Sequence, residues 1–211
     1  SVVGNMMYIV DYNSSEEAGT VKIFDSNFNW RENVNLSSDF KVYPPTYIEH
    51  NSESNNFYIL SATGKAILQY TSNFELIKIH SLTDIDIIGI SGEVYRKIYF
   101  SEENKNIMYL QSSNNVYKKY ANRPEKFIGK FLYDNKGIGS GSEADMDITT
   151  LCIRPVIKDN LNKDEIFMYD SNKEILYKFL EDSNYQRIVS ESFDNKILSF
   201  DEIKIKPGEN V

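Results

Sequence analysis

Residues 56–74 read Asn56-Phe-Tyr-Ile-Leu-Ser-Ala-Thr-Gly-Lys-Ala-Ile-Leu-Gln-Tyr-Thr-Ser-Asn-Phe74. The segment opens with a short apolar run, continues through a polar turn, and then alternates apolar and polar residues up to a Thr-Ser-Asn turn. Short apolar runs bounded by polar turn residues predict β-strands. Asn and Ser tolerate the left-handed backbone of tight hairpins, so the two turns predict antiparallel pairing of successive strands.

The same pattern occurs four times along the chain. The turn residues Asn27, Asn73 and Asn115 lie 46 and 42 residues apart, and Asn184 follows after a further 69. Self-similarity at such a period predicts a repeat architecture. The four turns are Asp25-Ser-Asn-Phe28, Thr71-Ser-Asn-Phe74, Ser113-Asn-Asn-Val116 and Asp182-Ser-Asn-Tyr185.

Each repeat contains up to four predicted strands, which become more polar from the first to the last. Candidate innermost strands are 46–49, 87–90 and 150–153, and the apolar inner runs are 6–10, 56–60, 97–100 and 165–169. Alternating strands follow at 20–24, 66–70, 106–110 and 174–179, and polar outer strands at 28–34, 74–79, 116–120 and 185–189. Four antiparallel strands with this gradient are typical of a propeller blade. The predicted fold class is therefore all-β, a β-propeller of about four to five blades.

The chain of 211 residues is predicted to be a single propeller domain, either complete in itself or part of a larger propeller. The long third spacing places extra residues in 123–147, predicted as an inter-blade loop with a short strand around 127–133. The tail, 193–206, alternates like closing strands that could pair into the first repeat and protect its edge. The predicted repeats are 1–38, 39–82, 83–122 and 148–192.

Composition excludes several classes of function. The aromatic content of 13% favours strands, and the net charge of −8 argues against a general affinity for nucleic acid or anionic lipid. No run approaches the ~18 apolar residues that a membrane-spanning helix needs, so membrane insertion is not predicted. The sequons at Asn13 and Asn35 fit a secreted or cell-surface protein, but the compartment is left open.

The single cysteine, Cys152, excludes an internal disulfide framework. Its alternating apolar context predicts a buried strand thiol. The two histidines, His50 and His80, are candidate bases by residue type alone, and a solvated or structural role is favoured for both. His80 ends a predicted outer strand at the blade periphery.

The blade pattern resembles NHL-type and YWTD-type propeller repeats. The resemblance rests on Ile98-Tyr-Phe-Ser-Glu-Glu-Asn-Lys-Asn106 and Ile166-Phe-Met-Tyr-Asp-Ser-Asn-Lys173. The Gly-rich stretch 139–145 is similar to the loop that precedes an NHL blade. The inner-strand Asp of these families is present as Asp11 and Asp170, whereas Ser61 and Ser101 replace it in the other repeats. The resemblance implies a propeller fold, with ligands at the mouth of the central channel.

On that geometry, the candidate binding residues are the polar side chains that follow the inner strands. Carboxylate and amide oxygens that converge there could bind calcium, although no cofactor is predicted. Turn residues that merely end the strands are the alternative interpretation. The candidates are Asp11, Asn13, Ser61, Thr63, Ser101, Glu102, Glu103, Asp170 and Asn172.

Three aromatic residues, Trp30, Tyr43 and Tyr47, are further candidates because Trp and Tyr are enriched at binding hot spots. Packing between blades explains them as well. The leading functional hypothesis is a non-enzymatic propeller that binds a protein or peptide, as a recognition or scaffold module. The alternative is a metal-dependent hydrolase or lyase with its site at the channel. The oligomeric state is left open.

Overall fold

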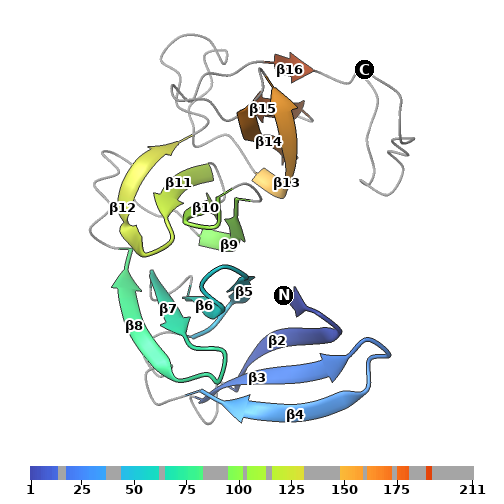
Figure 1. The fold of residues 1–211 in the computed structure, drawn as a ribbon, viewed down its shortest axis with the longest axis vertical. Coiled ribbons are helices and arrows are strands. Elements are labelled where there is room, and N and C mark those ends of the chain that lie inside the picture. The colour runs from blue at the N-terminus through green and yellow to red at the C-terminus, as the bar shows by residue number, and fades with distance from the viewer. Residues whose placement is uncertain are drawn as a thin grey trace.

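The structure is a computed structural model, and all its regular elements within the described residues are β-strands (Figure 1). The described residues are 1–13, 18–36, 44–61, 65–82, 95–101, 104–112, 116–130, 148–158, 161–172, 175–180 and 189–191. The predicted turns at 113–115 and 182–185, the Gly-rich stretch 139–145 and the predicted closing strands 193–206 lie outside them.

The strands form four four-stranded antiparallel sheets, and within each sheet every strand pairs with its neighbour in sequence. This arrangement confirms the predicted four-stranded blades. The first sheet consists of β1 (Val2–Val3), β2 (Met6–Asn13), β3 (Ala18–Asp25) and β4 (Trp30–Asn35). The second sheet consists of β5 (Tyr47–Asn51), β6 (Asn56–Ser61), β7 (Ala66–Tyr70) and β8 (Leu76–Ser81).

The third sheet differs from its predicted strand order. It consists of β9 (Tyr95–Phe100), β10 (Ile107–Ser112), β11 (Val116–Tyr120) and β12 (Arg123–Lys130). The run 97–100, predicted as a second strand, belongs to the edge strand β9, and the run 116–120, predicted as the outer strand, is third. The outermost strand β12 lies where a loop with a short strand at 127–133 was predicted. The predicted innermost strand 87–90 lies outside the described residues.

The fourth sheet follows the predicted order. It consists of β13 (Ile148–Lys158), β14 (Leu161–Asp170), β15 (Ile175–Leu180) and β16 (Val189–Glu191). The predicted innermost run 150–153 lies within β13. Of the predicted outer strand 185–189, only Val189 is described, and it begins β16.

The four sheets follow one another in an arc (Figure 1). The first strands β5, β9 and β13 lie toward the inside of the arc, and the last strands β4, β8 and β12 lie along its outside. The second and third sheets touch through equivalent strands, since β5 contacts β9 and β8 contacts β12. The gradient from apolar first strands to polar last strands therefore runs from the inside of the arc to the outside.

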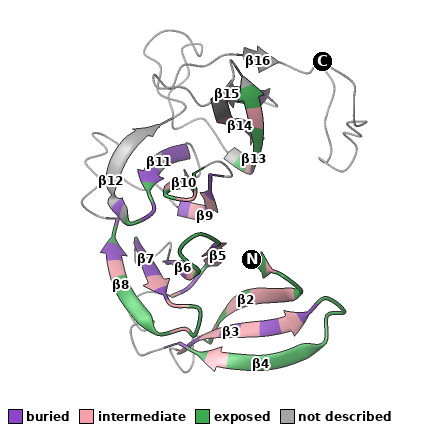
Figure 2. Ribbon diagram, viewed as in Figure 1, coloured by how far each residue is buried: buried purple, intermediate pink, exposed green. Residues whose placement is uncertain are grey.

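Buried residues gather on strands of the second and third sheets (Figure 2), and apolar side chains between successive sheets form the core. Strand β6 contributes to both interfaces of the second sheet, because side chains alternate between the two faces of a strand. Phe57 and Ile59 pack toward the first sheet, whereas Tyr58 and Leu60 pack toward the third, and all four are at most 2% exposed. Burying a side chain of this size contributes about 1.5–3 kcal/mol, so sheet-on-sheet packing is the main stabilising force.

Long-range side-chain hydrogen bonds connect neighbouring sheets. The Asn51 side-chain amide donates to the Lys105 carbonyl at 2.6 Å, joining the β5–β6 turn to the β9–β10 turn. The Tyr109 hydroxyl donates to the Asp164 carboxylate at 2.7 Å, joining the third sheet to the fourth. Tyr109 and Asp164 are completely buried, where a hydrogen bond to a charged group is worth about 1.5–3 kcal/mol.

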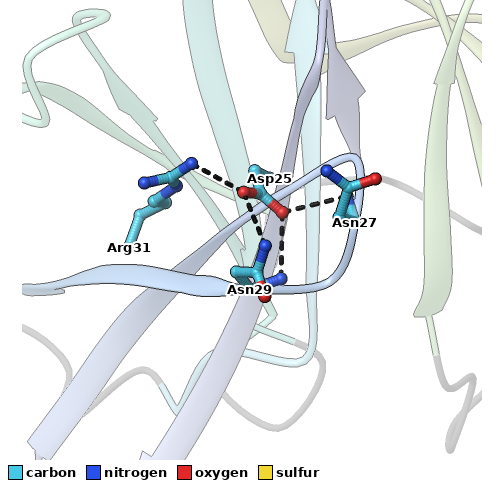
Figure 3. A network of polar contacts seen from close by, with 4 residues as sticks. All are labelled: Asp25, Asn27, Asn29 and Arg31. Atoms are coloured by element: carbon cyan, nitrogen blue, oxygen red, sulfur yellow. Dashed lines mark hydrogen bonds and ion pairs between the residues drawn. The ribbon is translucent and has the colours of Figure 1, made fainter.

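The β3–β4 turn is held by one carboxylate (Figure 3). Asp25 Oδ1 accepts from the backbone amides of Asn27 and Asn29, both at 2.9 Å. Its Oδ2 accepts from the Asn29 side chain at 3.1 Å and from Arg31 at 2.7 Å. The equivalent β7–β8 turn uses a hydroxyl instead, because Thr71 Oγ1 accepts from the amides of Asn73 and Glu75 at 3.3 and 3.1 Å. Asn recurs in these turns as the sequence predicts.

Candidate functional site

An open pocket of about 360 Å³ lies on the inner side of the arc, where the first strands of three sheets meet. It includes one carboxylate, one amine, one imidazole and one thiol beside aromatic and aliphatic side chains. Its walls come from stretches about fifty residues apart in the sequence, so only the repeat architecture brings them together. The lining residues are Tyr47, Glu49, His50, Tyr99, Phe100, Lys105, Leu151, Cys152 and Ile153.

Glu49 is the acidic group of the pocket. Its Oε2 accepts from the Tyr47 hydroxyl at 2.9 Å, and its Oε1 accepts from the Ser1 hydroxyl at 3.3 Å. Tyr47 and Glu49 are two positions apart on β5, so alternation places both side chains on the same face. This hydrogen bond fixes the carboxylate against the phenol ring.

Tyr99 of β9 brings a second phenol beside Tyr47, with the ring centroids 6.5 Å apart. Burial, and then the negative charge of Glu49, raises the pKa of Tyr99 to about 12. The same causes in the same order raise the pKa of Tyr47 far above its ordinary value. Both hydroxyls are therefore protonated at physiological pH, and that of Tyr47 donates to Glu49.

His50 borders the pocket from the other face of β5. Its ring centroid lies 4.9 Å from that of Phe57, and its Nε2 lies 3.1 Å from Asn55 Oδ1. His80 is 2% exposed, and its Nε2 lies 3.1 Å from Gln69 Oε1 at the outer part of the second sheet. The predicted structural role of His80 agrees with this placement, whereas His50 lies at the inner pocket.

The prediction of a buried thiol at Cys152 is wrong. Cys152 is exposed on β13 and lines the pocket, while its neighbour Leu151 is 5% exposed. An alternating run shows that one face of a strand is buried, but the edge strand β13 leaves part of its apolar sequence facing the inner space. The alternation along β13 is therefore present as predicted, but the face that carries Cys152 is exposed and not buried.

The predicted binding residues do not all meet at one end of the sheets. Ser61 and Asp170 end the second strands β6 and β14, and Asp11 lies within β2, two residues before its end at Asn13, so all three lie at the same end of their sheets. Ser101 follows the first strand β9, which runs antiparallel to a second strand and ends at the opposite end. There the Ser101 hydroxyl accepts from the Asn104 amide at 2.9 Å.

The surroundings of these residues differ as well. Asp11 is exposed and pairs with Lys22 at 2.6 Å, whereas Asp170 is buried and its Oδ1 accepts from the Asn172 amide at 3.1 Å. Ser61 is buried, and Asn13 and Asn172 are exposed. Thr63, Glu102, Glu103 and Tyr43 lie outside the described residues.

The two described aromatic candidates have different positions. Tyr47 lines the pocket, whereas Trp30 is 60% exposed at the start of β4 on the outside of the arc, where its Nε1 donates to Asn33 Oδ1 at 3.0 Å. Sequence reasoning missed Glu49 and Tyr99. The signal that could have found them is their alternation: Glu49 is two positions after Tyr47, and Tyr99 occurs in a run already assigned to an inner strand.

Within the described part of the chain, no group of three or more His, Cys, Asp or Glu side chains is arranged to hold a metal ion. Among the same residues, no helix has the length and hydrophobicity needed to cross a bilayer. The chemistry that the pocket does offer is a carboxylate fixed by Tyr47, a second phenol at Tyr99, and one amine.

Comparisons with known proteins identify the fold and no family. No family model and no curated protein matches the chain. The solved structure of virginiamycin B lyase from Staphylococcus aureus, an inactive variant with quinupristin, superposes with a TM-score of 0.50 at 8% identity, over 84% of this chain and 50% of that chain. Hydrazine synthase from Kuenenia stuttgartiensis gives a TM-score of 0.50 at 8% identity, over 87% and 48%.

The WD40 domain of SCAP from fission yeast gives a TM-score of 0.44 at 9% identity, over 89% of this chain and 43% of that chain. The chain thus spans about half the length of these solved structures. With its four-stranded antiparallel blades, the chain has a β-propeller fold, as the sequence predicts.

Proposed function

We propose that the chain is a propeller that binds a protein or peptide and that its inner pocket receives a positively charged side chain of that partner. The observation that carries the proposal is the Glu49 carboxylate, held against Tyr47 at 2.9 Å and flanked by Tyr99 in an open pocket. A cation is stabilised both by a carboxylate and by the faces of aromatic rings, and each contributes more when water is partly excluded.

Lys105 in the same pocket supports a peptide rather than a simple cation. Its ammonium group can donate a hydrogen bond to a backbone carbonyl or to a neighbouring carboxylate of the ligand, while Glu49 forms an ion pair with the cationic side chain. The net charge of −8 favours encounter with a basic partner. The inner-strand motifs at 98–106 and 166–173 support NHL-type or YWTD-type repeats as the blade family, which is part of the same proposal.

The test is a peptide array that varies one central residue among Lys, Arg, Gln and Glu, with calorimetric titration of the tightest peptide. We expect Lys or Arg to be required at that position. The variant Glu49→Gln keeps the size of the side chain and removes its charge, so affinity should fall about tenfold or more, the effect of one charge-assisted hydrogen bond.

The matched control is Glu75→Gln, the same change on an exposed residue of the β7–β8 turn, away from the pocket. It should leave the affinity unchanged. Equal binding of Lys, Gln and Glu peptides, or equal affinity of the Glu49→Gln and parent proteins, would contradict the proposal.

A metal-dependent hydrolase or lyase at the channel is the second candidate function. It is supported by Glu49 and His50, which border the pocket from opposite faces of β5 and could serve as acid and base there, and calcium is the proposed cation. Metal analysis of the purified chain and thermal unfolding with and without CaCl₂ test it. Absence of both bound metal and a shift in Tm would remove it.

A further inference from the structure

The first sheet has one face that no other described sheet covers. Tyr8 and Val10 of β2 and Val21 and Ile23 of β3 pack toward the second sheet. Side chains alternate along a strand, so the residues between them point the opposite way, to the outer end of the arc. The strand pairing then places Val2 beside Met7, Met7 beside Phe24, and Ile9 beside Lys22 on this open face.

The molecule itself shows what covers such a face. Met7, Ile9 and Phe24 occupy the same places in the first repeat as Phe57, Ile59 and Tyr70 in the second, counted from the equivalent turns at Asp25 and Thr71. The three residues of the second repeat are at most 2% exposed, because the first sheet packs on them. In the first repeat Ile9 is 43% exposed, Val2 is 71% exposed, and Met7 and Phe24 are half-buried.

The other end of the arc also carries an open face. Leu151, Ile153, Ile166 and Met168 lie on the same face of the fourth sheet as Asp164, which accepts the bond from Tyr109 of the third sheet. The alternate residues lie on the other face of this sheet, where Cys152 also borders the pocket. Among them, Arg154 pairs with Glu165 and stacks 5.2 Å from the centroid of Phe167.

The two open faces have similar chemistry. Each combines apolar side chains with one internal ion pair, Lys22 with Asp11 on the first sheet and Arg154 with Glu165 on the fourth. The interface between the first and second sheets and the interface between the second and third sheets are built from clusters of buried apolar residues. Apolar surface mixed with internally paired charges is typical of contacts between separately folded units.

We propose that the open face of the first sheet binds the open face of the fourth sheet in a second copy of this chain. Two arcs of four sheets, related by a two-fold axis, then close one ring of eight sheets. Both ends of each chain are covered by one kind of contact, as closed symmetry requires. Two further facts support a second copy: a sheet of the same repeat covers this face elsewhere, and the described sheets leave one side of the arc open.

The test is the mass of the full chain in solution, by light scattering and by sedimentation over a range of concentrations. The chain has a mass of 24.4 kDa, so the dimer should appear at twice that value. Ile9→Asp places a charge on the open face of the first sheet, where the exposed side chain leaves the monomer fold intact. We expect it to weaken dimerisation about a hundredfold or more, since a charge would replace an apolar side chain in the buried interface.

The matched control is Ile77→Asp, the same change at a side chain of similar exposure, 49% against 43%, on the outer strand β8. It should leave the dimer unchanged, and circular dichroism should show the same strand content in both variants. A parent chain that is monomeric at all concentrations, or a dimer that Ile9→Asp does not weaken, would overturn the proposal. Glu49→Gln should leave the dimer intact, so this result is independent of the pocket.

Discussion

The first and second sheets contain the same turn in different surroundings. Phe28 and Phe74 both have a left-handed backbone, with φ of 61° and 60°, and each amide donates at 3.0 Å to the carbonyl three residues earlier. Yet Phe28 is 75% exposed, whereas the Phe74 ring stacks on Phe57 with centroids 4.7 Å apart. Local sequence thus determines the turn, and the neighbouring sheet determines what the same residue contributes to stability.

The largest difference between the two sheets is expected at Phe57 and its counterpart Met7. Phe57 is 2% exposed and contacts the rings of Tyr8 and Phe74. Phe57→Ala should therefore lower the free energy of unfolding by about 3–4 kcal/mol. Met7→Ala, on the open face, should cost about 1 kcal/mol or less in the isolated chain. Urea denaturation at low protein concentration measures both, and equal losses would contradict the comparison.

Substitution by glycine should raise the stability of the protein at one of the two turn phenylalanines and lower it at the other. A left-handed backbone costs a residue with a side chain about 1–2 kcal/mol, which glycine avoids. Phe28→Gly should therefore stabilise the protein by about 0.5 kcal/mol, once the added freedom of the unfolded chain is subtracted. Phe74→Gly should destabilise it by about 2 kcal/mol, because the stacked ring is lost. Thermal unfolding of the pair tests this, and a shared sign would refute it.

The smallest expected difference is the pH dependence of the two turns. Hydrogen bonds from Asn29, then Asn27 and Arg31, lower the pKa of Asp25 from 3.8 to about 2. Because the folded pKa is below the ordinary value, the stabilisation is fully present above about pH 4 and is lost as the pH falls toward 2. Thr71 does not titrate, so its turn should show no such loss.

The measurement is Tm between pH 2 and 5 for the parent, Asp25→Asn and Thr71→Val. Asp25→Asn should flatten the acid limb of the profile, since it removes the titrating group. Thr71→Val should lower the free energy of unfolding by about 1 kcal/mol, the value for one capping side chain, and the resulting fall in Tm should not change with pH. A parallel profile for parent and Asp25→Asn would contradict the assignment.

The blade architecture could be predicted from sequence because each sheet is made of strands that are adjacent in the chain. The runs at 56–60 and 66–70 carry their own turns, so their pairing needed no distant information. The strand order of the third sheet could not be predicted in the same way. The apolar run 97–100 fits a first or a second strand equally well, and only contact with β5 identifies β9 as the first.

The candidate site could be predicted only in part. Tyr47 was identified, but its partners Tyr99 and Cys152 come from two other repeats. Which side chains of an edge strand face the inner space depends on the position of the next sheet, and alternation within the strand does not reveal it. The misplaced strand in the third repeat also moved Ser101 to the opposite end from Ser61.

The Asn51 contact has a consequence for the order of events on the ribosome. Its Oδ1 accepts from the amides of Glu53 and Ser54 at 3.0 and 3.1 Å, so this corner is shaped by residues already synthesised. Its amide nitrogen meets Lys105, which emerges 54 positions later. The Asn51 side chain can therefore be positioned before its partner in the next sheet has been synthesised. Vectorial synthesis should then assemble the blades one after another, each secured when the next arrives.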